Sequence, residues 1–322
     1  MPLVPTGSYR PPALLRNGHL HTIAPSLLRR VPLLTADRQR IPTPDGDFLD
    51  IDYYRAGNPR VAVIAHGLEG DSRQPYVQGL ATALARAGYD IAAWNLRGCS
   101  GSPNLLPLSY HSGATNDLHT VLTSILTNTL YQKIVLAGFS LGGNITLKYL
   151  ADHALTLDPR IAAAVAFSIP CDLAASATHL GNPSNRLYMA RFLVSLTAKI
   201  RAKQKRFPGS IDTSGLDRIR TFKEFDDRYT APLHGFRDAA DYWARASSGP
   251  ALHLLRVPAL LVNALDDPFL PPACYPRETA AASDHLFLET PPRGGHVGFV
   301  SSLNSPAYWS ESRAVTFFAD VL

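Results

Sequence analysis

The chain has 322 residues, of which 46% are hydrophobic, so it can bury one large core or two smaller ones. Its 31 basic and 26 acidic residues are dispersed and give a net charge of +5, a pattern that argues against a nucleic-acid partner. Three widely spaced cysteines give no sign of a disulfide framework or a zinc site, and no run approaches the roughly 20 apolar residues of a membrane-spanning helix. We therefore expect a cytoplasmic protein without stable membrane insertion.

The N-terminal part of the chain is rich in proline. Residues 1–40 are expected to form an irregular arm that lies over the body of the protein, and no secretory signal is evident in them. Strand-like residues at 38–42 and 47–54 then flank Pro44-Asp45-Gly46-Asp47, whose residue types favour a turn. The arm should therefore lead into a β-hairpin.

Apolar strands and amphipathic helices alternate along the next hundred residues. The predicted strands are 61–65, 90–94, 133–139 and 161–167, and the predicted helices are 75–87, 114–128 and 144–152. Alternation of this kind predicts an α/β fold with a mostly parallel central sheet flanked by helices on both faces. The strands are apolar throughout, as expected when both faces of a sheet are covered.

One of these strands runs directly into Gly138-Phe139-Ser140-Leu141-Gly142 and then into a helix. A G-x-S-x-G sequence in this context is the nucleophile elbow of an α/β-hydrolase, in which a strained turn exposes the serine hydroxyl to a cleft. An ordinary strand-to-helix turn is the alternative. We take Ser140 as the candidate nucleophile.

The alternation stops between about residues 170 and 250, where apolar residues follow a helical spacing instead, as at 189, 192, 193, 196 and 200. Strand patterns return at 259–263 and 284–289, and a helix is expected at about 306–321. We therefore predict a hydrolase core formed by 41–169 and 251–322, interrupted by a helical cap insertion at 170–250.

A serine hydroxyl needs a general base and a group that orients this base, and in this fold they follow in the order Ser, acid, His. Asp266 and Asp267 both follow the strand at 259–263 and either could be the acid, the other being a turn-forming side chain. We favour Asp267 because of a resemblance. Many hydrolases of this fold have, at this turn, an Asp that is followed by a residue such as Pro and then by an apolar residue. His296 lies in a glycine-flanked loop between the last strand and the last helix, so it is the candidate base, with a structural histidine as the alternative.

The tetrahedral oxyanion of acyl transfer needs two N–H donors. The residue after the nucleophile, Leu141, should supply one of them. The loop after the strand at 61–65 should supply the other, and within it we choose the N–H of Leu68. The His66 side chain is expected to order this loop, and Glu69 and Asp71 are expected to be solvated.

Further motifs have a structural interpretation. In the loop at 95–101, Arg97 should form an ion pair and Cys99 should be an inert buried thiol. His111 is expected to be structural, although it could face the cleft. The basic run at 199–206 should be the solvent-exposed face of a cap helix, with docking to an anionic membrane surface as the alternative.

Taken together, several motifs resemble the YheT-like branch of the α/β-hydrolases. They are Asn17-Gly18-His19-Leu20-His21-Thr22, His66 to Ser72, Asn95 to Gly101, Tyr110-His111-Ser112-Gly113, Gly138 to Asn144 and Asn263 to Pro268. The branch includes eukaryotic ABHD-type lipid hydrolases, and its members resemble carboxylesterases or acylglycerol hydrolases with a Ser-Asp-His triad. Ser140, Asp267 and His296 fall on those positions. The membrane anchor of the eukaryotic relatives is not expected here.

These inferences predict a serine hydrolase that cleaves a small-molecule carboxylic ester through an acyl-enzyme, without a metal or an organic cofactor. A lipase or acylglycerol hydrolase and a thioester hydrolase are alternatives within the same chemistry. A ligand-binding protein on a hydrolase scaffold is the alternative outside catalysis. The oligomeric state is left open.

Overall fold

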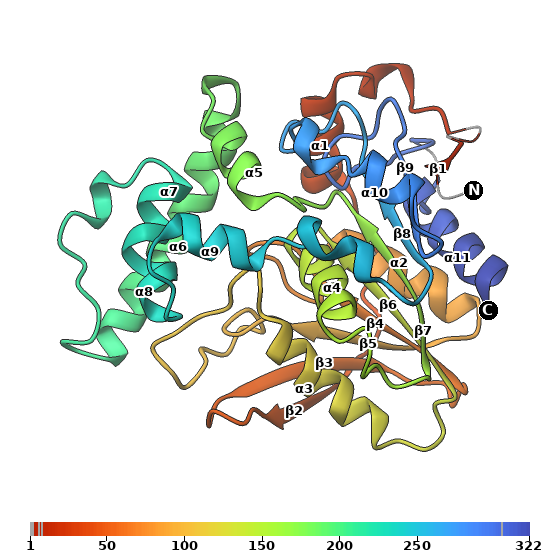
Figure 1. Cartoon of the computed structure of the whole chain (residues 1–322), viewed down its shortest axis with the longest axis horizontal. Helices are drawn as coiled ribbons and strands as arrows, with labels where there is room; N and C mark the ends of the chain where they lie inside the picture. Colours follow the sequence, from red (N-terminus) through yellow and green to blue (C-terminus); the bar gives the residue numbers. More distant parts are fainter. Residues whose placement is uncertain (1–2, 6, 8, 304) are drawn as a thin grey trace.

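A nine-stranded sheet forms the centre of the computed structural model, which describes residues 3–5, 7, 9–303 and 305–322 (Figure 1). Its strands are β1 (Leu3–Val4), β2 (Asp37–Pro42), β3 (Phe48–Tyr54), β4 (Arg60–Ala65), β5 (Asp90–Asn95), β6 (Lys133–Phe139), β7 (Ile161–Phe167), β8 (Ala259–Val262) and β9 (Leu286–Glu289). Their order in the sheet is β1-β9-β8-β7-β6-β4-β5-β3-β2.

The sheet is mostly parallel. Every pair from β1 across to β5 is parallel, whereas β3 runs antiparallel to β5 and β2 antiparallel to β3. The predicted hairpin is therefore confirmed, with β2 and β3 paired from Asp37 opposite Tyr53 to Pro42 opposite Phe48. The predicted α/β class with a mostly parallel sheet is confirmed as well.

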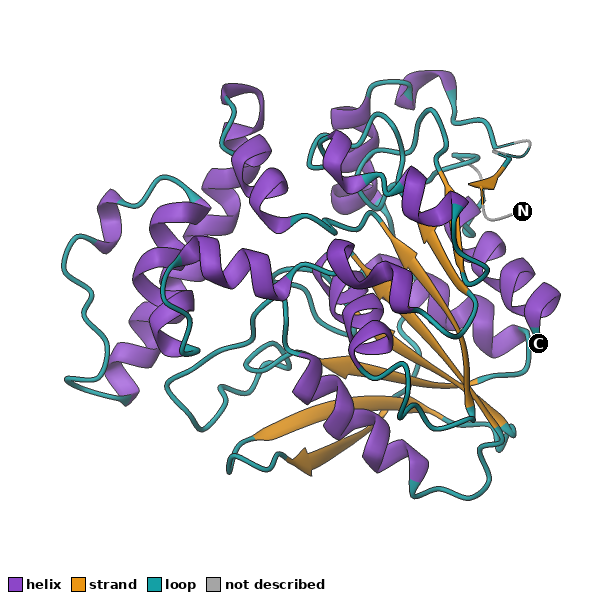
Figure 2. Cartoon of the chain, in the orientation of Figure 1, coloured by secondary structure: helices purple, strands orange, loops and turns teal. Residues whose placement is uncertain are grey.

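Helices cover both faces of the sheet (Figure 2). The α-helices that pack against it are α2 (Pro75–Arg86), α3 (Thr115–Leu126), α4 (Leu141–Asp152), α10 (Arg277–Ala281) and α11 (Trp309–Val321). Side chains alternate along β4, so that Val61 and Val63 pack with α3 and α4, whereas Ala62 and Ile64 pack with α2 and α11. Two buried layers result, one on each face.

The connections reverse direction at β4. From β4 the chain passes through α2 to β5, which lies next to β4 in the sheet. It then returns through α3 to β6, which lies next to β4 on its other edge. Because crossovers in parallel sheets are right-handed, this reversal places α2 and α3 on opposite faces. It also opens a crevice at the carboxyl ends of β4 and β6, where ligands bind in open α/β sheets.

The segment between β7 and β8 is helical and forms the green to cyan lobe on the left of Figure 1, away from both termini. It contains α5 (Leu173–Leu180), α6 (Arg186–Arg206), α7 (Phe222–Phe225), a π-helix (Asp226–Thr230), α8 (Ala231–Leu233) and α9 (Ala239–Ala246). In α6 the predicted apolar stripe is inward, since Met189, Leu193 and Ile200 are buried in the core.

The prediction of an irregular stretch at residues 1–40 is wrong. Helix α1 (Gly18–Leu28) lies within it, and the side chain of Asn17 caps this helix by accepting hydrogen bonds from the N–H groups of His19 and Leu20. Strand β1 extends the sheet by pairing with β9. The prolines misled the prediction, because a proline inside a helix costs stability. Pro25 nevertheless lies inside α1, where it is buried together with His21.

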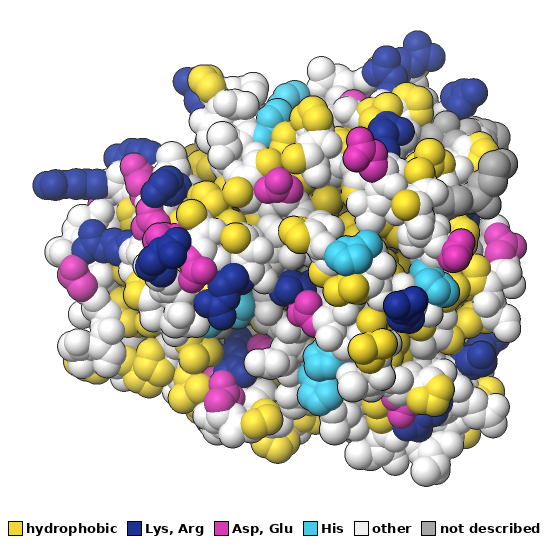
Figure 3. Space-filling view, viewed as in Figure 1, with side chains coloured by type: hydrophobic (Ala, Val, Ile, Leu, Met, Phe, Trp, Pro, Cys, Tyr) yellow, Lys and Arg dark blue, Asp and Glu magenta, His cyan; other side chains and the backbone are white. Residues whose placement is uncertain are grey.

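The surface in Figure 3 carries basic and acidic side chains interspersed with one another, in line with the small net charge. Among the described residues, no helix combines the length and the apolar character needed to cross a membrane.

Candidate active site

Ser140 lies at the turn between β6 and α4, in the crevice at the switch point of the sheet. Its backbone has φ 51° and ψ −120°, a conformation that residues other than glycine rarely adopt. Two glycines permit the close passage of strand and helix there: a Cβ on Gly142 would lie 2.3 Å from the carbonyl oxygen of His66, and one on Gly138 would lie 2.5 Å from the Cα of Gly143. The strained turn predicted from the motif is therefore present.

His296 and Asp267 lie in line with this serine. The Nε2 of His296 is 2.9 Å from the Oγ of Ser140, and its Nδ1 is 2.9 Å from Oδ2 and 3.1 Å from Oδ1 of Asp267. A buried carboxylate can only accept here, so Nδ1–H donates to Asp267 and leaves Nε2 free to accept from the serine hydroxyl. The three side chains form one chain of hydrogen bonds.

The neighbouring Asp266 does not contact the imidazole. Its Oδ1 accepts a hydrogen bond of 2.9 Å from the N–H of Gly295, and burial raises the pKa of this carboxyl. Asp266 thus holds the loop that carries His296, which is the turn-forming role that the sequence left open for one of the two aspartates. The structure places Asp267, and not Asp266, against the histidine.

The loop after β4 lies beside Ser140, since a Cβ on Gly67 would be 3.3 Å from the Cβ of Ser140. The carbonyl oxygen of Gly67 accepts from the N–H of Gly70 at 3.1 Å and from Nδ1 of His66 at 2.8 Å. Because C=O and N–H of a trans peptide point in opposite directions, these bonds fix the direction of the Leu68 N–H. In the described part of the chain, no acceptor occupies the N–H of Leu68.

His66 orders this loop rather than facing the serine. Its Nε2 accepts from the N–H of Leu96 at 3.1 Å, and burial lowers the pKa of His66 to about 4, so the ring is neutral. Leu141 opens α4, where the first N–H groups of a helix have no intrahelical partner. Of the two N–H groups predicted to bind the oxyanion, that of Leu68 thus lies in a loop held by hydrogen bonds, and that of Leu141 lies at a helix N-terminus.

Helix α1 supports the loop that carries His296, and this contact was not predicted from the sequence. The Oγ1 of Thr22 accepts from the N–H of His296 at 2.8 Å, and Nε2 of the buried His21 accepts from the N–H of Val300 at 2.9 Å. A Cβ on Gly298 would lie 2.2 Å from the carbonyl oxygen of His21, so the loop and helix touch. The motif Asn17 to Thr22 was the available signal, although its spacing alone does not reveal this contact.

Backbone strain gathers around the same crevice. Among the described residues, the non-glycine residues with positive φ are Glu69, Ser140, Ser168, Val297 and Phe299. One follows Leu68, one is the elbow serine, and two lie in the loop of His296. The fifth, Ser168, accepts from the N–H of Val297 at 2.9 Å through its Oγ. Strain concentrated in this way is typical of functional sites, where the surrounding structure holds unfavourable conformations.

Two cavities meet at Ser140. The first, which we call the apolar cavity, lies under α5, α6, α7 and the π-helix and includes Leu173, Leu180, Phe192, Leu196, Phe222 and Phe225 in its wall. The second, the mixed cavity, opens toward α1 and includes Thr22, Gln74, Tyr76, Tyr188, Arg191 and Tyr308. Leu68, Glu69, Ser140, Phe192, Phe269 and His296 border both cavities. A substrate can therefore extend from the serine in two chemically different directions.

His111 lines the apolar cavity, but it does not bond to Ser140. Its ring packs against His234 with centroids 4.5 Å apart, and its Nδ1 accepts from the N–H of Gly113 at 3.1 Å. Burial lowers the pKa of His111 to about 3, so the ring is neutral. Both roles considered from the sequence, structural support and exposure to the cleft, thus apply to this side chain.

One expectation for charged residues is wrong and a second holds only in part. Glu69 is buried rather than solvated, because Lys199, Ser195 and Tyr110 bind its carboxylate. The basic run at 199–206 is only partly a solvent-exposed face, since Lys199 and the buried Lys203 point into the protein. Helical spacing alone could not reveal this, because the loops that receive these ammonium groups come from distant parts of the chain.

Within residues 3–5, 7, 9–303 and 305–322, no group of three or more His, Cys, Asp or Glu side chains is arranged to hold a metal ion. The three cysteines are free thiols.

Known proteins resemble this chain over most of its length. A family model described as the alpha/beta hydrolase fold matches residues 61–303. YheT of Escherichia coli (strain K12) is 36% identical over 306 residues, which cover 92% of this chain and 88% of YheT. Phospholipase ABHD3 of Homo sapiens is 28% identical, with 93% of this chain and 75% of ABHD3 covered.

Solved structures share the architecture. The Pyrococcus furiosus esterase Pf2001 matches with a TM-score of 0.61 at 16% identity, over 91% of this chain and 96% of that one. At this level of identity the likeness concerns the fold alone.

Proposed function

This chain belongs to the α/β-hydrolase fold family and to its YheT-like branch, and we propose from this premise that it is a serine hydrolase of carboxylic esters. The observation that carries the proposal is the hydrogen-bond chain from Ser140 through His296 to Asp267. A relative at 28% identity, ABHD3, is named a phospholipase, and phospholipases cleave ester bonds of lipids. The three free cysteines fit a reducing, cytoplasmic location.

In the proposed reaction, Nε2 of His296 accepts the proton of the Ser140 hydroxyl as its Oγ attacks the ester carbonyl. Asp267 holds the ring in the tautomer that can accept this proton and stabilises the imidazolium that forms. The N–H groups of Leu68 and Leu141 donate to the oxyanion of the tetrahedral intermediate. The imidazolium then protonates the departing alcohol, and water, activated by the same histidine, releases the acid from the acyl-enzyme.

The two cavities suggest how an ester would lie. We assign the acyl chain to the apolar cavity, because the leucine and phenylalanine side chains that form much of its wall offer dispersion contacts. The ionisable residues Glu69, Lys199 and Asp226 also border this cavity. The mixed cavity would then take the alcohol and admit water. In this proposal residues 170–250 act as a cap, since they provide most of the apolar wall, while 41–169 and 251–322 form the core and 1–40 the arm.

The direct test is turnover of p-nitrophenyl esters of increasing acyl length by the wild type and by Ser140→Ala. We expect hydrolysis by the wild type and a loss of roughly 10⁴-fold or more in kcat for the variant. A wild type that is inactive on every ester would contradict the proposal. If Ser140→Ala instead keeps both the ligand affinity and the biological effect of the wild type, the protein is a binder on a hydrolase scaffold.

The apolar cavity also favours a second candidate, hydrolysis of lipid esters such as acylglycerols. Rates that rise steeply above the solubility limit of a long-chain ester would support this activity. Faster turnover of an acyl thioester than of the matched oxygen ester would indicate a thioesterase, which the same triad can serve.

A further inference from the structure

We propose that Glu69 and Lys199 form a positioning pair, through which helix α6 holds the loop that presents the Leu68 N–H to the oxyanion. The inference rests on the proposed function and adds two positioning residues to it. Its starting point is the backbone of Glu69, which directly follows Leu68 and has a φ of 56°. A residue with a long side chain keeps such a conformation only where the surroundings hold it.

Tyr110 provides part of that hold. Its hydroxyl accepts a hydrogen bond of 2.8 Å from the N–H of Glu69 and donates one of 2.6 Å to Oε1 of the same residue. The hydroxyl of one buried tyrosine therefore bonds to both the backbone and the side chain of Glu69. The peptide that follows Leu68 cannot rotate without breaking both bonds.

Helix α6 supplies the charge. The Nζ of Lys199 is 2.7 Å from Oε1 of Glu69, and the hydroxyl of Ser195, one turn earlier, donates to Oε2. The side chain of Glu69 is only 8% exposed, so its carboxylate depends on these partners rather than on water. Burial raises the pKa of Glu69, but Lys199 and the hydrogen bonds outweigh it and leave the pKa below its usual range. The pair is ionised at neutral pH.

These contacts join elements that are otherwise far apart in the chain. Glu69 follows β4 in the core, whereas Ser195 and Lys199 lie on the helix that forms a wall of the apolar cavity. Without the ammonium group, a buried carboxylate would lack its counter-charge and would turn toward water, which would rotate the backbone next to Leu68. The N–H of Leu68 would then leave its position, and stabilisation of the oxyanion would suffer more than substrate binding.

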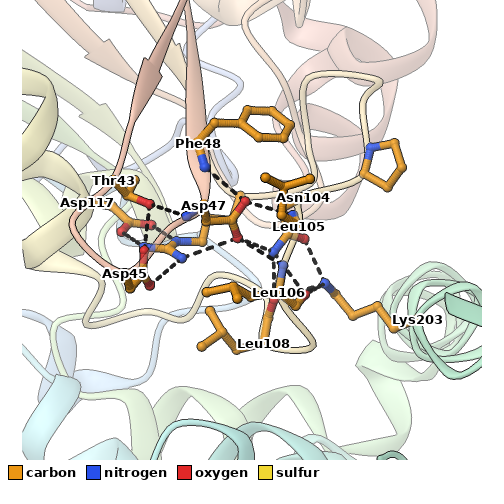
Figure 4. Close-up of polar contacts among 12 residues, drawn as sticks. Thr43, Asp45, Asp47, Phe48, Asn104, Leu105, Leu106, Leu108, Asp117 and Lys203 are labelled. Atoms are coloured by element: carbon orange, nitrogen blue, oxygen red, sulfur yellow. Dashed lines mark hydrogen bonds and ion pairs between the residues drawn. The ribbon is translucent and has the colours of Figure 1, made fainter. Parts of the chain in front are cut away.

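The same helix provides a matched control. Lys203, one turn after Lys199, is buried and donates to Oδ1 of Asn104 at 2.7 Å and to the carbonyl oxygens of Leu106 and Leu108 at 2.8 and 2.9 Å (Figure 4). It anchors α6 to the loop at 104–108 through bonds that involve neither Leu68 nor Glu69. Loss of Lys203 therefore loosens the helix without releasing the carboxylate of Glu69.

The test compares Lys199→Met, Glu69→Gln and Lys203→Met for kcat, KM and affinity for a trifluoromethyl ketone, which binds a serine hydrolase as a tetrahedral oxyanion. We expect the first two variants to lower kcat by about 10- to 100-fold, which is less than the roughly 10²- to 10³-fold loss when an oxyanion donor is removed outright. Their KM should stay within about threefold, and their affinity for the ketone should fall by the same factor as kcat. Lys203→Met should melt at a lower temperature but keep its kcat within about threefold.

Equal kcat values in all variants would overturn the inference, and so would an equal loss in Lys203→Met or an effect on KM alone. Lys199→Met leaves the buried carboxylate of Glu69 without its counter-charge, so this variant could fail to fold. In that case Tyr110→Phe, which deletes only the hydroxyl that bonds to Glu69, carries the same test. A wild type without ester turnover would contradict the proposed function. An active wild type matched by Lys199→Met and Glu69→Gln would contradict this inference alone.

Discussion

At the scale of residues, two adjacent aspartates differ in what they hold. Asp267 bonds to the imidazole of His296 and also accepts from the N–H of Phe269 at 2.9 Å, whereas Asp266 accepts from the N–H of Gly295. The first therefore orients the proposed base and the second orients the loop around it. Substitution of each by asparagine separates the two effects.

We expect Asp267→Asn to lower kcat by roughly 10⁴-fold, because an amide can donate to the ring and stabilise the wrong tautomer. Asp266→Asn keeps an oxygen that can accept from Gly295 and should lower kcat by less than about tenfold. Steady-state kinetics with one p-nitrophenyl ester checks both variants. A larger loss in Asp266→Asn than in Asp267→Asn would contradict the assignment.

Asp226 in the π-helix should make stability depend on pH. Burial raises its pKa to about 6 although Thr230 and Trp243 bond to its oxygens, so the folded state binds the proton more tightly than the unfolded state. The stability that this proton contributes is present below about pH 4 and is lost as the pH rises through 6. From the size of the shift the change is on the order of 3 kcal/mol.

Urea unfolding of the wild type and Asp226→Asn between pH 4 and 7 tests this titration, because other groups cancel in the difference. Relative to the wild type, the free energy of unfolding of the variant should rise across this range and level off above pH 6. A constant difference would show that Asp226 does not titrate in that range.

At the scale of elements, α1 acts on the site from outside the central sheet. Thr22 accepts from the N–H of His296 and donates its own hydroxyl proton to the carbonyl oxygen of Gly18 at 2.7 Å. The helix therefore fixes the backbone of the loop that carries the proposed base. The mixed cavity lies between this helix and α6, so α1 also borders the path to Ser140.

Thr22→Val removes this acceptor while keeping the shape of the side chain. We expect kcat to fall by about tenfold and the free energy of unfolding to fall by about 1–2 kcal/mol, because the N–H of His296 loses its partner. Thr120→Val is the matched control, since the hydroxyl of Thr120 on α3 makes the equivalent bond to the carbonyl oxygen of Asn116. A kcat equal to that of the control would mean that α1 does not position the histidine.

At the scale of the whole molecule, much of the arrangement could be predicted from the sequence. Strand and helix periodicities located β4 to β7 and α2 to α4 to within a few residues, because buried parallel strands and amphipathic helices leave strong patterns. The G-x-S-x-G elbow and the order Ser, acid, His pointed to three side chains that the structure brings into hydrogen-bond contact. These features follow from local sequence combined with the rules of the fold.

The rest depended on contacts between distant segments. Helix α1 includes a proline and gains its support from the loop of His296, and β1 has only two residues. From the sequence, Glu69 and Lys199 are expected to be solvated charges, whereas in the fold Oε1 of Glu69 and Nζ of Lys199 are 2.7 Å apart. Charge and composition describe a side chain alone, whereas burial and pairing are properties of the assembled chain.

Ser140 is the proposed nucleophile, and covalent labelling identifies the attacking residue without any assumption about the substrate. Wild type and Ser140→Ala are treated with a fluorophosphonate, and the modified peptide is identified by mass spectrometry. We expect one label per chain, on Ser140, with ester turnover lost in proportion to labelling and no label on the variant. Turnover of esters by a wild type that carries the label on another residue, or no label, would contradict this assignment.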